Sequence, residues 1–199
     1  GIQKVVVDLR GVATGTLNEA VEVANLFIRS GELAKVAGRD GKVIKSFAAD
    51  ASKAVFDGKV NVLIDFGTAG AAEVVAGAFI DHKRGDVVGE RSFGAGTEQQ
   101  LFTLRGGDGL LLTTAKWASP NGVPFLGDDR NNTGIKPTVE VKRPDTPEPL
   151  EVEELIEQQD QEKNEPKPSA SPTPKSEPAK SAVEDLQLKK ALELLRATA

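Results

Sequence analysis

Few side chains of this sequence could act as a nucleophile, a general base or a metal ligand. The chain has no Cys, so it offers no thiolate nucleophile, no disulfide and no Cys-ligated metal, and its single His, His82, excludes a multi-His metal site. Three hydroxyl residues, Thr68, Ser92 and Thr97, fall within residues 60–100. A hydroxyl is a weak nucleophile without a general base, and none is visible beside these three.

The stretch 60–100 has the pattern of elements that positions backbone N–H groups for chemistry. An apolar run at 60–64 predicts a buried strand, a Gly-containing turn follows, and a helix of small residues is expected over 69–82. Val87 and Val88 predict a second short strand before a Gly-rich loop that ends in two glutamines. A strand that turns abruptly into a helix exposes the first N–H groups of that helix, where a developing oxyanion can be stabilised. The expected backbone geometry suits acyl transfer, but the side chains of this stretch do not supply a nucleophile with a general base.

Two motifs lie in this stretch, GTAGAAE at 67–73 and GERSFGAGTEQ at 89–99. They resemble G-[ST]-A-S-A-S-E and G-E-x-[ST]-F-G-K-G-x-x-Q of the C-terminal processing peptidases, also called tail-specific proteases. In that family the first Ser after the Ala is the nucleophile, the Lys is the base and the Gln orients it. By this resemblance Gly70 occupies the position of the nucleophile and Ala95 that of the base, while Gln99 is retained.

The resemblance extends over residues 3–141 with every motif in order. Upstream, VVVDLRG at 5–11 and LNEAV at 17–21 are similar to D-L-R-x-N-P-G-G-x-L-x-x-A-V, and downstream DGLLLTTAK at 108–116 and GIKP at 134–137 match further signatures of the family. Several ordered motifs are a more specific signal than any single one.

The resemblance implies an oxyanion hole at Ala71 and Gly15. In place of the family's N-P-G-G turn this chain has VATG at 12–15, a departure that affects the oxyanion position at Gly15. Thr138 stands where the family usually has Asp.

The implied fold class is α/β, a ClpP/crotonase-like core with a parallel-rich twisted sheet flanked by helices. The family carries an N-terminal helical region and a PDZ domain before this point, and those parts are expected to be missing from this chain. The implied partner is an extended peptide or a protein C-terminus, with no cofactor and no metal. The implied location is the bacterial periplasm or another extracytoplasmic compartment.

Three functional hypotheses follow. With Gly70 and Ala95 at the catalytic positions, the first is a serine-type peptidase domain that is proteolytically inactive. The alternative is a pseudoprotease that acts as a peptide-binding or assembly module. A weaker alternative is a crotonase-like acyl-CoA enzyme, because that fold is related, and only Glu73 and Glu98 could supply its paired carboxylates in this stretch.

Composition predicts three parts. Residues 1–143 hold 18 Lys/Arg against 17 Asp/Glu and no basic stripe, so this core domain is not expected to bind nucleic acid. Residues 144–180 hold eight of the eleven prolines and ten Asp/Glu against four Lys, which predicts a disordered linker. Residues 181–199 predict an amphipathic helix, which begins at a capping box, Ser181-x-x-Glu184. The sequence has no run of about 18 apolar residues, so no membrane span is expected.

Other elements are expected around the site. A helix over 17–30 begins at the capping box Thr16-x-x-Glu19, and its place between strands at 5–9 and 33–36 predicts a βαβ unit. Strands at 101–104 and 110–115 are expected to form a hairpin. A weaker strand is expected at Val43 and Ile44, a short helix at 48–54 and a last strand at 138–141. His82 is expected to be exposed. In the terminal helix, Leu188, Ala191, Leu192 and Leu195 share one face, through which the chain could form a homo-oligomer.

Overall fold

The computed structural model describes residues 1–129, 132–143 and 184–197. The chain divides into two compact units, Gly1–Lys142 with Leu186–Ala199, and Arg143–Asp185. All the described helices and strands belong to the first unit. The predicted linker at 144–180 and the predicted cap at Ser181 lie outside the described residues, so the division into core, linker and terminal helix stays a prediction.

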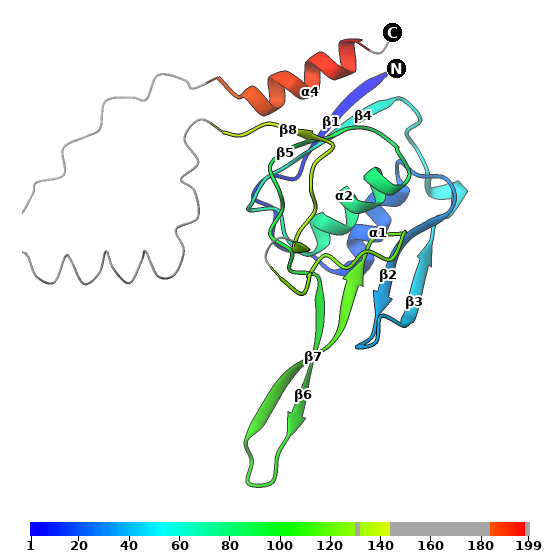
Figure 1. The fold of residues 1–199 in the computed structure, drawn as a ribbon. Coiled ribbons are helices and arrows are strands. Elements are labelled where there is room, and N and C mark those ends of the chain that lie inside the picture. Colours follow the sequence, from blue (N-terminus) through cyan, green and yellow to red (C-terminus); the bar gives the residue numbers. More distant parts are fainter. Residues whose placement is uncertain (130–131, 144–183, 198–199) are drawn as a thin grey trace, which may run out of the picture. The chain divides into compact units, whose positions relative to one another are not determined.

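A parallel sheet forms the centre of the first unit (Figure 1). Its strands lie in the order β1-β4-β5-β8 and comprise β1 (Lys4–Asp8), β4 (Lys59–Ile64), β5 (Val87–Gly89) and β8 (Val139–Glu140). Val5 pairs with Val60 and Val7 with Val62, so the two apolar runs that predict strands at 5–9 and 60–64 lie side by side in one sheet. The last five residues of β4 are buried, as expected of a parallel strand covered on both faces.

Two helices, α1 (Leu17–Asn25) and α2 (Ala71–Asp81), pack on one face of this sheet, as the fold prediction required. The helix predicted over 17–30 ends earlier, at Asn25. Every residue of α2 from Ala71 to Phe79 is buried, so this helix is enclosed on all sides. Its small residues permit that enclosure, since a Cβ at Gly77 would lie 2.9 Å from a ring carbon of Phe125.

A second, antiparallel sheet lies on the other side of α1 and α2 (Figure 1). Its order is β3-β2-β7-β6, from β3 (Val43–Ala48), β2 (Glu32–Ala37), β7 (Gly109–Ala118) and β6 (Thr97–Thr103). The βαβ prediction was therefore wrong, because β2 pairs antiparallel with β3 and β7 and not with β1. The β6–β7 hairpin is confirmed, and the short helix expected at 48–54 is a 3₁₀ turn, Ala51–Lys53.

The terminal helix α4 (Leu186–Ala197) covers the opposite face of the parallel sheet. Ala191 is fully buried against Leu63 and Val88, and its carbonyl accepts a hydrogen bond of 2.9 Å from Asn61 Nδ2. The predicted apolar face is correct for Leu188, Ala191 and Leu195, whereas Leu192 is 39% exposed. No helix within the described ranges is long and apolar enough to cross a membrane.

We expect the substitution Ala191→Asp to destabilise the fold strongly and Leu192→Asp, one residue along the same helix, to do so only weakly. The first places an uncompensated carboxylate against apolar side chains of the sheet and should cost about 3 kcal/mol or more. The second changes a partly exposed side chain and should cost less than about 1 kcal/mol. Urea unfolding of both variants measures the difference, and equal effects would contradict the docking of α4.

Candidate functional site

Gly70 begins α2 at the sharp turn that follows β4. Its φ of 58° and ψ of −111° lie where glycine is favoured and other residues are strained. A Cβ built on Gly70 has only one neighbour within 4 Å, Cζ3 of Trp117 at 3.9 Å. The position that the resemblance assigns to the nucleophile therefore has room for a side chain, on a backbone that holds it under strain.

Glu73, one turn into α2, is fully buried, and its carboxylate binds the backbone at both Gly70 and Ala95. Its Oε2 accepts the backbone N–H groups of Gly70 and Ala95, both at 2.9 Å. Its Oε1 accepts the Gly94 N–H at 2.7 Å and the Ser92 hydroxyl at 2.5 Å. A carboxylate offers about four lone-pair sites, and here four donors of the same chain use them. The loop that carries Ala95 is thus fixed against the start of α2.

This role of Glu73 was missed by sequence reasoning. The available signal was its position three residues after the helix N-cap, where a carboxylate commonly reaches back to the N-cap N–H. Because its oxygens are saturated and Glu98 lies exposed on β6, the pair of carboxylates needed by the acyl-CoA hypothesis is not brought together for acid–base work.

Ala71 and Gly15, the two predicted oxyanion positions, lie next to each other. A Cβ built on Gly15 would be 3.1 Å from the Cβ of Ala71. Among the described residues no acceptor is found for the Ala71 N–H, although Gly70 and Glu73 on either side have partners. The start of α2 therefore presents one unused backbone donor beside Gly70.

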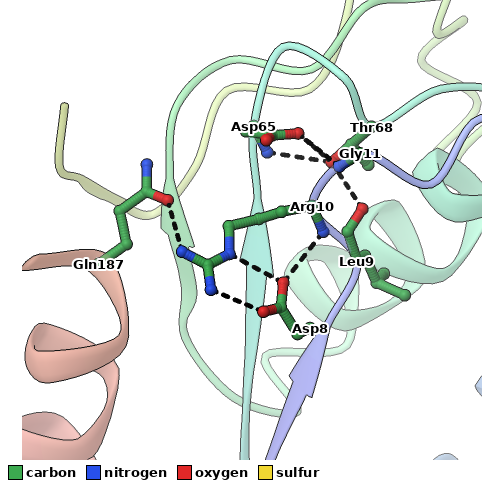
Figure 2. Close-up of polar contacts among 7 residues, drawn as sticks. All are labelled: Asp8, Leu9, Arg10, Gly11, Asp65, Thr68 and Gln187. Carbon is green, nitrogen blue, oxygen red and sulfur yellow. Dashed lines mark hydrogen bonds and ion pairs between the residues drawn. The ribbon is translucent and has the colours of Figure 1, made fainter. Parts of the chain in front are cut away.

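The turn that carries Gly70 is bound to the end of β1 by a buried polar cluster (Figure 2). The Thr68 hydroxyl donates to the Leu9 carbonyl at 2.9 Å and accepts the Asp65 N–H at 3.0 Å. The Asp65 carboxylate accepts the Gly11 N–H at 2.9 Å. The segment that leads to Gly15 and the segment that leads to Gly70 are therefore held as one piece.

Arg10 extends this cluster to α4 (Figure 2). Its guanidinium makes two bonds to the Asp8 carboxylate, at 2.8 and 2.6 Å, and donates to Gln187 Oε1 at 3.2 Å. Gln187 is 1% exposed and donates in turn to the Val141 carbonyl at 2.8 Å. The terminal helix thus contacts the strand end on which part of the site is built.

The capping box at the start of α1 is confirmed and fixes the chain just after Gly15. Glu19 Oε2 accepts the Thr16 N–H at 2.7 Å and the Thr16 hydroxyl at 2.9 Å. These bonds, the one to the backbone first, lower the pKa of Glu19 below its ordinary value. A lowered pKa means that this cap stabilises the fold above the ordinary pKa of Glu and loses that effect as the pH falls through the lowered value.

The other sequence candidates are engaged in hydrogen bonds of the fold or lie on β6. Thr68 and Ser92 are buried and their hydroxyls are engaged, the latter also accepting the Ile135 N–H at 2.6 Å. Thr97 and Gln99 lie on β6, where Gln99 is exposed. His82, expected to be exposed, is half-buried, with Nε2 2.6 Å from the Glu32 carbonyl, because β2 crosses the end of α2. Within the described ranges no group of three or more His, Asp or Glu residues is arranged to hold a metal ion.

We expect Glu73→Gln to destabilise the protein by about 3 kcal/mol or more, since an amide NH₂ would face backbone N–H groups and leave buried donors without acceptors. Glu98→Gln, on an exposed part of β6, is the matched control and should change the free energy of unfolding by less than about 0.5 kcal/mol. Urea unfolding gives both values. A Glu73→Gln variant as stable as the control would show that the loop is held by other contacts.

Comparison with known proteins identifies the family. The sequence pattern of peptidase family S41 matches residues 1–141. The carboxy-terminal-processing protease of Bartonella bacilliformis is 35% identical over 139 residues, which are 70% of this chain and 31% of the relative. The carboxy-terminal processing protease CtpB of Bacillus subtilis is 35% identical over 158 residues, 78% of this chain and 32% of the relative.

The fold agrees with the sequence comparison. The photosystem II D1 C-terminal processing protease superposes with a TM-score of 0.63 at 32% identity, over 71% of this chain and 35% of that one. The α/β prediction of a parallel sheet flanked by helices is confirmed. The chain spans about a third of the length of the relatives it matches. On both sequence and structure, this chain belongs to peptidase family S41.

Proposed function

We propose that this chain is a proteolytically inactive S41 domain that receives an extended peptide or a protein C-terminus beside α2 without cleaving it. The observation that carries the proposal is the pair Gly70 and Ala95, which stand at the family's nucleophile and base positions. Gly70 has no atom with which to attack a carbonyl, and Ala95 has no nitrogen to take a proton. Gln99 can orient a base only where a base exists.

No neighbouring hydroxyl is available as a substitute nucleophile. The hydroxyls of Thr68 and Ser92 are buried and already hydrogen-bonded, and the carboxylate that Ser92 contacts, Glu73, is itself occupied by four donors. Removal of the nucleophile from a well-studied serine protease lowers turnover by about 10⁶. A chain without either partner is therefore expected to retain no useful rate.

Two features support peptide binding. The unused Ala71 N–H beside Gly70 can donate to a peptide carbonyl or carboxylate. β6, which begins two residues after Ala95, is the outermost strand of its sheet and pairs only with β7 in the described structure, so an extended peptide can add to its free edge.

The family resemblance adds three expectations to this proposal. They are an upstream PDZ domain in the longer protein, a location in the periplasm or another extracytoplasmic compartment, and a homo-oligomer formed through α4. Because α4 buries Ala191 and Leu195 on its own sheet, only its outer face, with Leu186 and Leu192, is left for a second copy. We therefore expect a weak association: light scattering should give a monomeric mass for dilute protein and a larger mass at high concentration, which Leu192→Asp should return to that of the monomer.

Restoring the two side chains tests inactivity. The substitutions Gly70→Ser and Ala95→Lys, singly and together, are assayed on an unstructured peptide with an apolar C-terminus, with Gly70→Ala as the control that carries the same backbone strain and no hydroxyl. We expect no cleavage by the parent, the single variants or the control, and cleavage by the double variant. A parent that cleaves as fast as the double variant would refute the proposal.

If the double variant binds the peptide but does not cleave it, the 12–15 turn has also lost the oxyanion geometry. Binding by the parent, followed by fluorescence anisotropy of the labelled peptide, separates that outcome from a chain that binds no peptide.

A further inference from the structure

Two phenylalanines on the loops of the site keep half of their surface in water. Phe66, in the turn between β4 and α2, is 50% exposed, and Phe93, two residues before Ala95, is 51% exposed. Their rings contact each other edge to face with centroids 5.5 Å apart. We propose that Phe66 and Phe93 form an apolar subsite that takes an apolar side chain of the bound peptide, an inference that rests on the proposed function.

Both rings stand on backbone that the buried networks of the site hold in place. The turn around Phe66 is closed by the Thr68 N–H, which donates to the Asp65 carbonyl at 2.9 Å. The Phe93 N–H donates to the Thr68 carbonyl at 2.9 Å, which joins the two loops directly. On either side of Phe93, Ser92 and Gly94 donate to Glu73. The pair is therefore preorganised, which lowers the entropy lost when a ligand binds.

The size of the pair favours one side chain over a folded partner. A phenylalanine buries on the order of 200 Å², so two half-exposed rings leave on the order of 200 Å² together. A stable protein–protein interface needs about 800 Å² from each partner. The remaining apolar surface is too small for a second copy and suits a single aliphatic or aromatic side chain.

The position of the pair favours a peptide over a free apolar molecule. Phe66 lies four residues before Gly70. The next residue, Gly67, packs on Gly11, since a Cβ added to Gly67 would be 2.9 Å from Gly11 Cα. The unused Ala71 N–H lies at the other end of the same turn. A ligand that uses both features must carry a carbonyl or carboxylate oxygen together with an apolar group, which is the chemistry of a peptide.

The experiment measures binding of two labelled, unstructured peptides by fluorescence anisotropy, one ending in three leucines and the other identical but ending in three serines. The variants are Phe66→Ala and Phe93→Ala, with Ile44→Ala as the control. Ile44 is 64% exposed on β3, at the opposite edge of the antiparallel sheet from β6. Phe66→Leu keeps an apolar surface and tests for rescue.

We expect the parent to prefer the leucine peptide, and Phe66→Ala and Phe93→Ala each to weaken its binding by about fivefold to tenfold, the effect of losing half a phenylalanine contact. Binding of the serine peptide should not change, Ile44→Ala should match the parent, and Phe66→Leu should stay within about threefold of the parent.

Leucine-peptide binding that is unchanged in both alanine variants would overturn the subsite and leave the proposed function standing. An equal loss in Ile44→Ala would overturn it as well, since the effect would not be local. A parent that binds neither peptide would overturn both proposals. A concentration-dependent mass that both alanine variants abolish would assign the pair to a contact between copies instead.

Discussion

A buried carboxylate that has no cation paired with it among the described residues is the constraint on which the site depends. A charge taken out of water is tolerated in a protein interior only when hydrogen bonds replace its hydration. The donors to Glu73 come from the start of α2 and from the loop that precedes β6, and Ser92 passes the connection on to Ile135. These segments cannot move apart without leaving that charge unsolvated, so their relative placement follows from one side chain.

Three of the four donors to Glu73 are backbone N–H groups, so the side chains at 70 and 95 take no part in holding the site together. For that reason the fold of the site does not depend on which side chains stand at these two positions. A side chain at Gly70 would hold a strained φ, at a cost of about 1–2 kcal/mol, which glycine avoids. Glycine at this position is therefore the residue that the backbone of the domain favours.

The parts of this structure that sequence predicts are those encoded locally. The continuous apolar runs predicted β1 and β4 as buried strands, and the motifs placed Gly70 at a strand-to-helix turn and Ala95 in a Gly-rich loop. What was missed depends on contacts between distant segments. The strand–helix–strand order could not reveal that β2 joins the second sheet, periodicity could not separate Leu192 from Ala191, and a Glu in a helix cap gave no sign that it also binds residues 92–95.

The position of α4 in the chain has a consequence for biosynthesis. Two of the residues that bind it through hydrogen bonds, Asn61 and Arg10, precede their partners by 130 and 177 positions. At about 5–20 residues per second, a ribosome adds the 130 residues in roughly ten seconds, and during that time the sheet face with Leu63 and Val88 lacks the helix that packs on it. The nascent chain thus exposes an apolar sheet face of the kind that chaperones bind until α4 has been made.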